Sequence, residues 1–176
     1  MILKHLKLTF LVGLTLSCAT PIAFAQGFLT APLFSETGTA KAVEADHIVV
    51  NDLVVGLYGI DAPLRIQPCI KDGREFACGV EARHALDALL EQGPVTCEQV
   101  RDPNMRRRML RFARCTIGDM DVAAEMVRLG MAMAFPPQSD EYVALEQAAK
   151  AAGAGLWSAD EFRPPWEWEE ERQQEQ

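Results

Sequence analysis

The chain has 176 residues, 49% of them hydrophobic, and its formal net charge at pH 7 is −8. This length suits one domain with a single core, and no stretch after the N-terminus is apolar enough to cross a membrane. The acidic balance argues against tight, non-specific binding to nucleic acid, although a local basic patch and a divalent cation can offset the overall field.

Residues 1–25 have the pattern of a secretory signal peptide. A basic start is followed by an apolar run, and Ala23-Phe24-Ala25 supplies a cleavage site before Gln26. A lipid anchor on Cys18 is the alternative, but Thr15-Leu16-Ser17 is a poor lipobox. Cleavage removes two lysines and no acidic residue, so the net charge falls from −8 to −10. We expect an exported protein, periplasmic or secreted.

Strand patterns follow a flexible lead-in of residues 26–36. Asn51-Asp52 is a turn signal between two of the expected strands. Short antiparallel strands joined by tight turns are typical of a small barrel or a meander. The strands that we expect are residues 39–43, 47–50, 53–60, 95–100 and 109–117.

Three helices are expected among these strands. They cover residues 80–90, 122–129 and 140–152, and residues 64–77 form a loop before the first. Asp121 caps the second helix. The order strand-strand-strand-helix-strand-strand-helix-helix predicts an α+β fold, a five-stranded OB-fold β-barrel with three helices.

The end of the chain, residues 158–176, is an acidic tail that contains tryptophan. Such tails are mostly solvated and mobile, and docking onto a partner is the alternative interpretation. The expected domain therefore covers residues 37–157.

Four cysteines remain after cleavage, and an even count in an exported domain predicts two disulfides. Three pairings are possible. We favour Cys69–Cys78, which closes a short loop, and Cys97–Cys115, which cross-links two strands of a hairpin. A metal site is the alternative, but there is no C-x-x-C motif and no histidine near a cysteine pair in the sequence.

A series of short motifs resembles the staphylococcal-nuclease-like (thermonuclease) family in the same order along residues 37–157. The resemblance implies an OB-fold barrel and Ca²⁺-dependent hydrolysis of the phosphodiesters of DNA and RNA. The motifs are Val43-Glu44-Ala45-Asp46, Leu57-Tyr58-Gly59-Ile60-Asp61-Ala62-Pro63, Cys78-Gly79, Met126-Val127-Arg128-Leu129-Gly130-Met131-Ala132 and Gly155-Leu156-Trp157.

The same resemblance implies a metal site. Asp46 and Asp61 match the metal carboxylates, and the backbone carbonyl of Ala62 is a third ligand. The family pattern reads roughly R-L-x-G-I-D-A-P-E, and here Gly56 stands at the arginine and Leu64 at the glutamate. The structural alternative is that Asp46 sits in a turn and Asp61 caps backbone amides.

The family also has an arginine on its second hairpin, where an ungapped count places Leu110. Side chains alternate along a strand, so Arg108 projects on the same face as Leu110 and is our candidate phosphate ligand and catalytic residue. Arg106, Arg107 and Arg108 form a basic patch, either an anion site or a solvated hairpin tip. His47 is a packing residue or a base beside Asp46.

Two functions follow from this pattern. The first is an exported Ca²⁺-dependent phosphodiesterase that is weak or inactive, because removing one preorganised charge-stabilising group costs about 10²–10³ in rate. The second is a non-catalytic OB module that binds a nucleic acid, a nucleotide, an acidic polysaccharide or a partner protein. Some bacterial members of the family are associated with acidic exopolysaccharide production. The sequence carries no signal for the oligomeric state.

Overall fold

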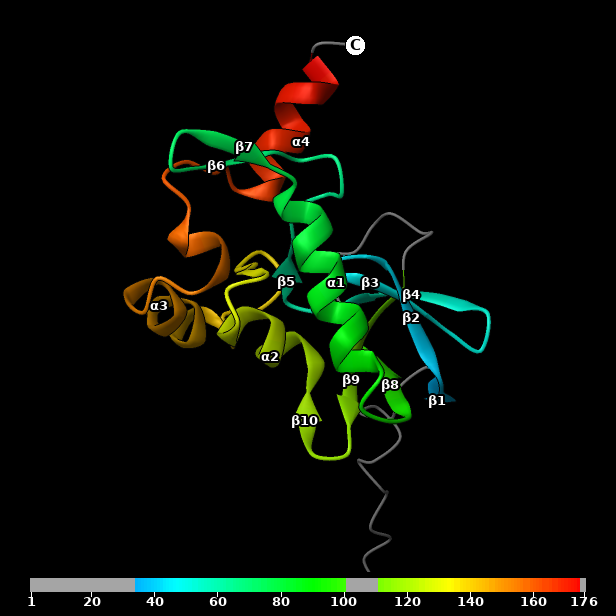
Figure 1. Cartoon of the computed structure of the whole chain (residues 1–176). Coiled ribbons are helices and arrows are strands. Elements are labelled where there is room, and N and C mark those ends of the chain that lie inside the picture. The colour runs from blue at the N-terminus through cyan, green and yellow to red at the C-terminus, as the bar shows by residue number, and fades with distance from the viewer. Residues whose placement is uncertain (1–33, 101–110, 175–176) are drawn as a thin grey trace, which may run out of the picture. The chain divides into compact units, whose positions relative to one another are not determined.

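The computed structural model describes residues 34–100 and 111–174 (Figure 1). The predicted signal peptide, most of the lead-in and Arg106, Arg107 and Arg108 lie outside the described residues. In the described part of the chain, no helix has the length and apolar character needed to span a bilayer.

The main sheet is built from short strands whose path is β1-β8-β9-β4-β3-β2, with β10 paired to β9. β4 and β9 are parallel, and the other neighbours are antiparallel. The strands are β1 (Ser35–Gly38), β2 (Ala40–Glu44), β3 (His47–Val50), β4 (Leu53–Leu57), β8 (Val95–Gln99), β9 (Arg111–Ile117) and β10 (Met120–Asp121).

The two ends of this path are consecutive in the chain, because only Thr39 separates β1 from β2. β1 pairs with β8 and β2 pairs with β3, so one bent segment joins the first and last strands of the path. The hydrogen-bonded ladder is interrupted at Thr39. This arrangement confirms the predicted α+β, OB-like fold, with β1 and β2 acting as the two halves of its first strand.

Local sequence explains the tight turn of the first meander. Asn51 and Asp52 have φ values of 47° and 64°, the left-handed pair that a two-residue hairpin needs. Alternate residues of the flanking strands, Ile48, Val50 and Val55, are fully buried in the core. The predicted strand 53–60 ends at Leu57, and β5 (Ile60–Asp61) pairs instead with β11 (Met133–Ala134).

Three of the helices match the predicted ones, with small differences at their ends. They are α1 (Cys78–Leu90), α2 (Val122–Arg128) and α3 (Val143–Ala151), and the 3₁₀ turn η2 (Gly155–Ser158) follows α3. Asp121 caps α2 as predicted, since its Oδ1 accepts a hydrogen bond from the Ala124 amide at 3.0 Å. α1 lies against β2, where Asp87 accepts a hydrogen bond from the Ala42 amide.

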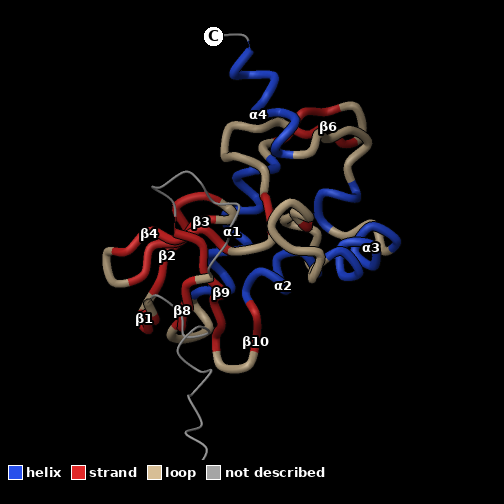
Figure 2. The backbone as a smooth tube through the Cα atoms, turned by 180° about the vertical axis from the view of Figure 1, so that it is seen from behind, coloured by secondary structure: helices blue, strands red, loops and turns tan. Residues whose placement is uncertain are grey.

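Three further parts of the chain differ from the prediction (Figure 2). β1 begins at Ser35, within the expected flexible lead-in, because its residues pair with β8. The expected loop 64–77 contains a hairpin of β6 (Cys69–Lys71) and β7 (Arg74–Phe76), turned at Asp72 and Gly73 with φ values of 52° and 67°. The Asp-Gly pair was the overlooked signal. The tail expected to be solvated forms a fourth helix, α4 (Pro165–Gln174), whose first residue Pro165 is fully buried.

Both disulfides form in the predicted pairing. Cys69–Cys78 joins β6 to the first residue of α1, and Cys97–Cys115 joins directly opposed positions of β8 and β9. The start of α1 also fixes the loop after β5, because a Cβ at Gly79 would lie 1.9 Å from the carbonyl oxygen of Leu64. Only glycine allows this close approach of helix and loop.

Candidate functional site

Three neighbouring strands bring His47, Gly56 and Phe112 into register. His47 is opposite Gly56, and Gly56 is paired in turn with Phe112. A Cβ at position 56 would lie 2.6 Å from the Phe112 ring and 3.1 Å from Nε2 of His47. The place where the resemblance requires an arginine is therefore closed by an aromatic ring and an imidazole.

Asp46 and His47 form the best-defined polar contact of the site. Asp46 lies in the turn between β2 and β3, is only 9% exposed, and its Oδ1 is 2.6 Å from Nδ1 of His47. Burial alone would lower the pKa of His47, but the hydrogen bond to Asp46 and the charges of Asp46, Asp61 and Glu44 raise it overall. His47 therefore packs beside Phe112 and is also poised to carry a proton.

Asp61 ends β5 and shares the electrostatic environment of Asp46. Burial, followed by the negative charges of Asp46 and Glu169, raises the pKa of Asp61 to about 7. A hydrogen bond from the Ala62 amide and the charge of His47 act in the opposite direction. The fold thus brings together three residues that the sequence singled out: Asp46, His47 and Asp61.

Glu169 is a residue of this region that the sequence did not reveal. Burial and the charge of Asp46 raise its pKa, while His47 lowers it. Glu169 also lines a hollow of about 220 Å³ together with Leu64 and Trp168. α4 thus brings the carboxylate of Glu169 near Leu64, the position at which the family pattern has a glutamate. The Pro164-Pro165 start of a helix was a local signal, but no local pattern indicates where α4 packs.

The donor set for a metal ion is incomplete. Calcium takes six to eight oxygen ligands, and the predicted set is Asp46, Asp61 and the carbonyl of Ala62. Within residues 34–100 and 111–174, no group of three or more His, Cys, Asp or Glu side chains is arranged to hold a metal ion. The described residues therefore fit a weakly held cation better than a tight calcium site.

The arginines of β9 that the structure describes have partners elsewhere. Arg114 pairs with Glu141 and lies 5.8 Å from the centroid of the Tyr58 ring, and Arg111 lies over the Phe34 ring. Pairing with Glu141 is the main cause that raises the pKa of Arg114. Arg108, our candidate phosphate ligand, lies outside the described residues, so its role stays a prediction.

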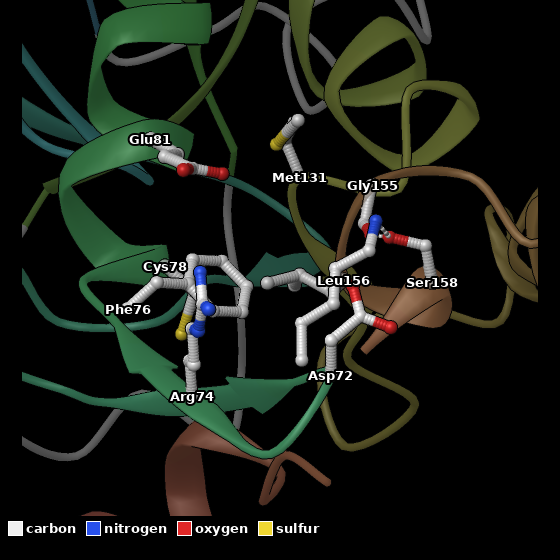
Figure 3. Close-up of a pocket in the computed structure, with 10 residues that line it drawn as sticks. Asp72, Arg74, Phe76, Cys78, Glu81, Met131, Gly155, Leu156 and Ser158 are labelled. Carbon is white, nitrogen blue, oxygen red and sulfur yellow. Dashed lines mark hydrogen bonds between the residues drawn. The ribbon is translucent and has the colours of Figure 1, made fainter. Parts of the chain in front are cut away.

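A separate pocket of about 300 Å³ opens between the β6–β7 hairpin, the start of α1 and η2 (Figure 3). Phe76 and Leu156 are among its apolar lining, and Arg74, Asp72 and Glu81 are among its charged lining. Of the predicted metal and catalytic residues that the structure describes, none lines it. The pocket borders the Cys69–Cys78 bridge at Cys78 and is distinct from the site at Asp46.

Two comparisons with known proteins bear on this geometry. The sequence model of the family described as "Staphylococcal nuclease homologue" matches residues 54–159. A relative, the "Succinoglycan biosynthesis protein ExoI" of Rhizobium meliloti (strain 1021), is 33% identical over 127 residues, which are 69% of this chain and 64% of the relative. The chain thus spans less than two thirds of the relative's length. Because the family match covers more than half of the chain, this protein belongs to the staphylococcal nuclease homologue family.

Proposed function

We propose that this chain is an exported family member whose calcium-dependent phosphodiester hydrolysis is weak or absent, and that it acts as a polysaccharide-binding module in exopolysaccharide production. The observation that carries the proposal is the closure of position 56. An arginine there would have to displace both the Phe112 ring and the His47 imidazole.

The charge around Asp46 supports the same conclusion. Asp46, Asp61 and Glu169 are all carboxylates, and His47 is the cationic group that acts on them. Phosphoryl transfer depends on positive groups that stabilise charge on the phosphate oxygens. A site with this excess of carboxylates repels a phosphodiester unless a cation is bound.

A bound calcium ion would be held weakly by Asp46, Asp61 and the carbonyl of Ala62, and would supply Lewis-acid charge stabilisation. Among the described residues of this site, the chain's own side chains supply proton-holding groups but no further positive charge for the phosphate. His47 holds a proton against Asp46, and Asp61 exchanges a proton near neutral pH. Leu64 cannot orient a water molecule through its side chain.

Two further observations support the polysaccharide role. The relative's printed name refers to the biosynthesis of succinoglycan, and the family resemblance includes members associated with exopolysaccharide production. Both disulfides suit an oxidising compartment, where an exported protein meets such a polymer.

The test measures two activities of the chain from Gln26 onward, purified with both disulfides formed. Hydrolysis of single-stranded DNA and of RNA is followed with millimolar calcium and with chelator, beside Asp61→Ala. Binding to succinoglycan is followed by calorimetry. We expect cleavage no faster than in Asp61→Ala, together with polysaccharide binding. Calcium-dependent cleavage that Asp61→Ala abolishes, without polysaccharide binding, would overturn the proposal.

A residual nuclease is the second candidate, and one observation favours it. The pKa of Asp61 at about 7 suits a group that gives or takes a proton at neutral pH. In that case Arg108 supplies the phosphate contact, and Arg108→Ala should remove the cleavage that Asp61→Ala removes.

A further inference from the structure

The C-terminal helix is fixed to the domain beside the loop that follows β5. The side-chain amide of Gln67 donates a hydrogen bond to the carbonyl of Arg163 at 2.8 Å, just before α4 begins. Pro165 is fully buried, and the Trp166 ring packs 5.7 Å from the Phe135 ring. In Figures 1 and 2, α4 lies beside the β6–β7 hairpin. α4 is therefore packed against the rest of the domain.

Two hollows lie beside α4, and Trp168 lines both of them. The first, about 220 Å³, lies between Leu64 and the helix and includes Glu169. The second, about 420 Å³, is lined by Trp168 with Phe162 and Ile70 among others. Trp168 is common to the lining of both hollows, and we call the two together the groove along α4. The charge of Glu169 acts on Asp61, and the charge of Asp46 acts on Glu169.

The charges of this groove disfavour a phosphate-bearing ligand. The described lining includes Glu75, Glu161 and Glu169 against Arg163 and Arg172. Both arginines are engaged: Arg163 pairs with Glu171, and the Arg172 guanidinium lies 4.7 Å from the centroid of the Trp168 ring. A phosphodiester backbone would meet an excess of carboxylates and no arginine without a partner among these lining residues.

The same lining suits a ligand that carries many hydroxyl groups. Carboxylates and the side-chain carbonyl of Gln173 accept hydrogen bonds from hydroxyls, and the side-chain NH2 of Gln173 donates to hydroxyl oxygens. Trp168 and Phe162 offer apolar surface to the C–H faces of a ring. A sugar ring has both kinds of surface, whereas a nucleic acid strand needs cations as well.

We propose that the groove along α4 binds the hexose units of a polysaccharide chain, with Trp168 as the apolar contact and Glu169 as a hydrogen-bond acceptor. The inference rests on the proposed function and narrows its ligand: the protein contacts the sugar rings through their hydroxyls and C–H faces. It also gives the acidic end of the chain a role within the domain.

The experiment uses the chain from Gln26 onward and two probes, a β-linked glucose tetrasaccharide and an eight-nucleotide single-stranded DNA. Binding is measured by saturation-transfer NMR and by titration of tryptophan fluorescence. We expect the tetrasaccharide to bind, Trp168→Ala to weaken it at least tenfold, and Glu169→Gln to weaken it about threefold to tenfold. Glu170→Gln is the matched control, because Glu170 is exposed and lines neither hollow, and it should bind as the wild type does.

Several outcomes would overturn this inference, and they separate it from the proposed function. Unchanged binding by both Trp168→Ala and Glu169→Gln places the sugar elsewhere, and the proposed function stands if succinoglycan still binds. DNA binding that Trp168→Ala removes gives the groove a different ligand. No tetrasaccharide binding refutes the groove, and an added loss of succinoglycan binding refutes both proposals. Glu169→Gln keeps the test valid if Trp168→Ala fails to fold.

Discussion

The missing side chain at position 56 is a packing requirement of this particular chain. The Phe112 ring from β9 and the imidazole of His47 from β3 meet over the strand between them, at a backbone position where a Cβ would lie 2.6 Å from the ring. A side chain at position 56 is therefore incompatible with the present positions of the Phe112 ring and the His47 imidazole. We expect that Gly56→Arg alone would not form a phosphate site.

Gly56→Ala should lower the free energy of unfolding by about 1–3 kcal/mol, because the added methyl group overpacks the space against Phe112. Urea denaturation measures the change. The double variant Gly56→Ala/Phe112→Ala should show a coupling energy of at least about 0.5 kcal/mol, since removing the ring relieves the clash. If the changes in unfolding free energy of the two single variants add up to that of the double variant, the Phe112 ring does not clash with a side chain at position 56.

At the scale of elements, the C-terminal helix depends on the loop between β5 and β6. Gln67 is fully buried in that loop. Its side-chain amide donates a hydrogen bond to the carbonyl of Arg163, and its own backbone carbonyl oxygen lies 3.4 Å from Sγ of Cys78. Oε1 of Gln67 is buried without a partner. This residue links the disulfide to the start of α4, and so to the groove at Trp168.

Gln67→Leu should loosen α4 while leaving the main sheet intact. The variant loses the hydrogen bond to Arg163, worth about 1 kcal/mol, although it also removes the unpartnered Oε1. Native-state hydrogen exchange should become about fivefold faster for the amides of residues 168–174, with no change in the strands. Lys71→Met, which removes the hydrogen bond to Ser158 instead, is the control. Equal exchange of α4 in Gln67→Leu and wild type contradicts the anchoring role.

At the scale of the whole molecule, the fold concentrates negative charge in one region. Carboxylates from the turn before β3, from β5 and from α4 meet around His47, although they are far apart in the sequence. An acidic chain that gathers like charges gives up part of its stability when they ionise. That cost makes the stability of the protein depend on pH.

The free energy of unfolding should fall as pH rises from about 4 to 7, and it should level off only when His47 has also lost its proton. The folded state holds the Asp61 proton up to about pH 7, whereas the unfolded chain releases it near 3.8, so the folded state binds more protons in that window. The raised pKa of His47 adds stability below 6.5 that is lost above it, in the same direction. We expect a total change of about 2–4 kcal/mol.

Urea titrations at several pH values, with chelator present, measure this dependence. Asp61→Asn should remove most of the slope between pH 4 and 7, while Asp119→Asn, at an exposed turn, should keep it. A wild-type profile that rises over this range would mean that Asp61 ionises freely in the folded protein.

Much of the fold follows from local sequence. The strands around Asn51-Asp52, the cap at Asp121 and helix α1 depend on residues close in the chain, and alternation or capping predicts them. The disulfide pairing was also predicted, because each pair closes a local loop or spans one hairpin. The β6–β7 hairpin carries a local Asp-Gly signal as well, at Asp72 and Gly73.

The sequence by itself determined the family and the OB-like architecture, because short motifs in a fixed order carry that information. It also singled out Asp46, His47 and Asp61 as candidate site residues. Only the tertiary structure decided that Phe112 closes position 56 and that α4 brings Glu169 toward Asp46. The first arrangement joins residues of β4 and β9, and the second joins the turn before β3 to the last helix. No local periodicity encodes such pairs, since they depend on which surfaces the packed core leaves adjacent.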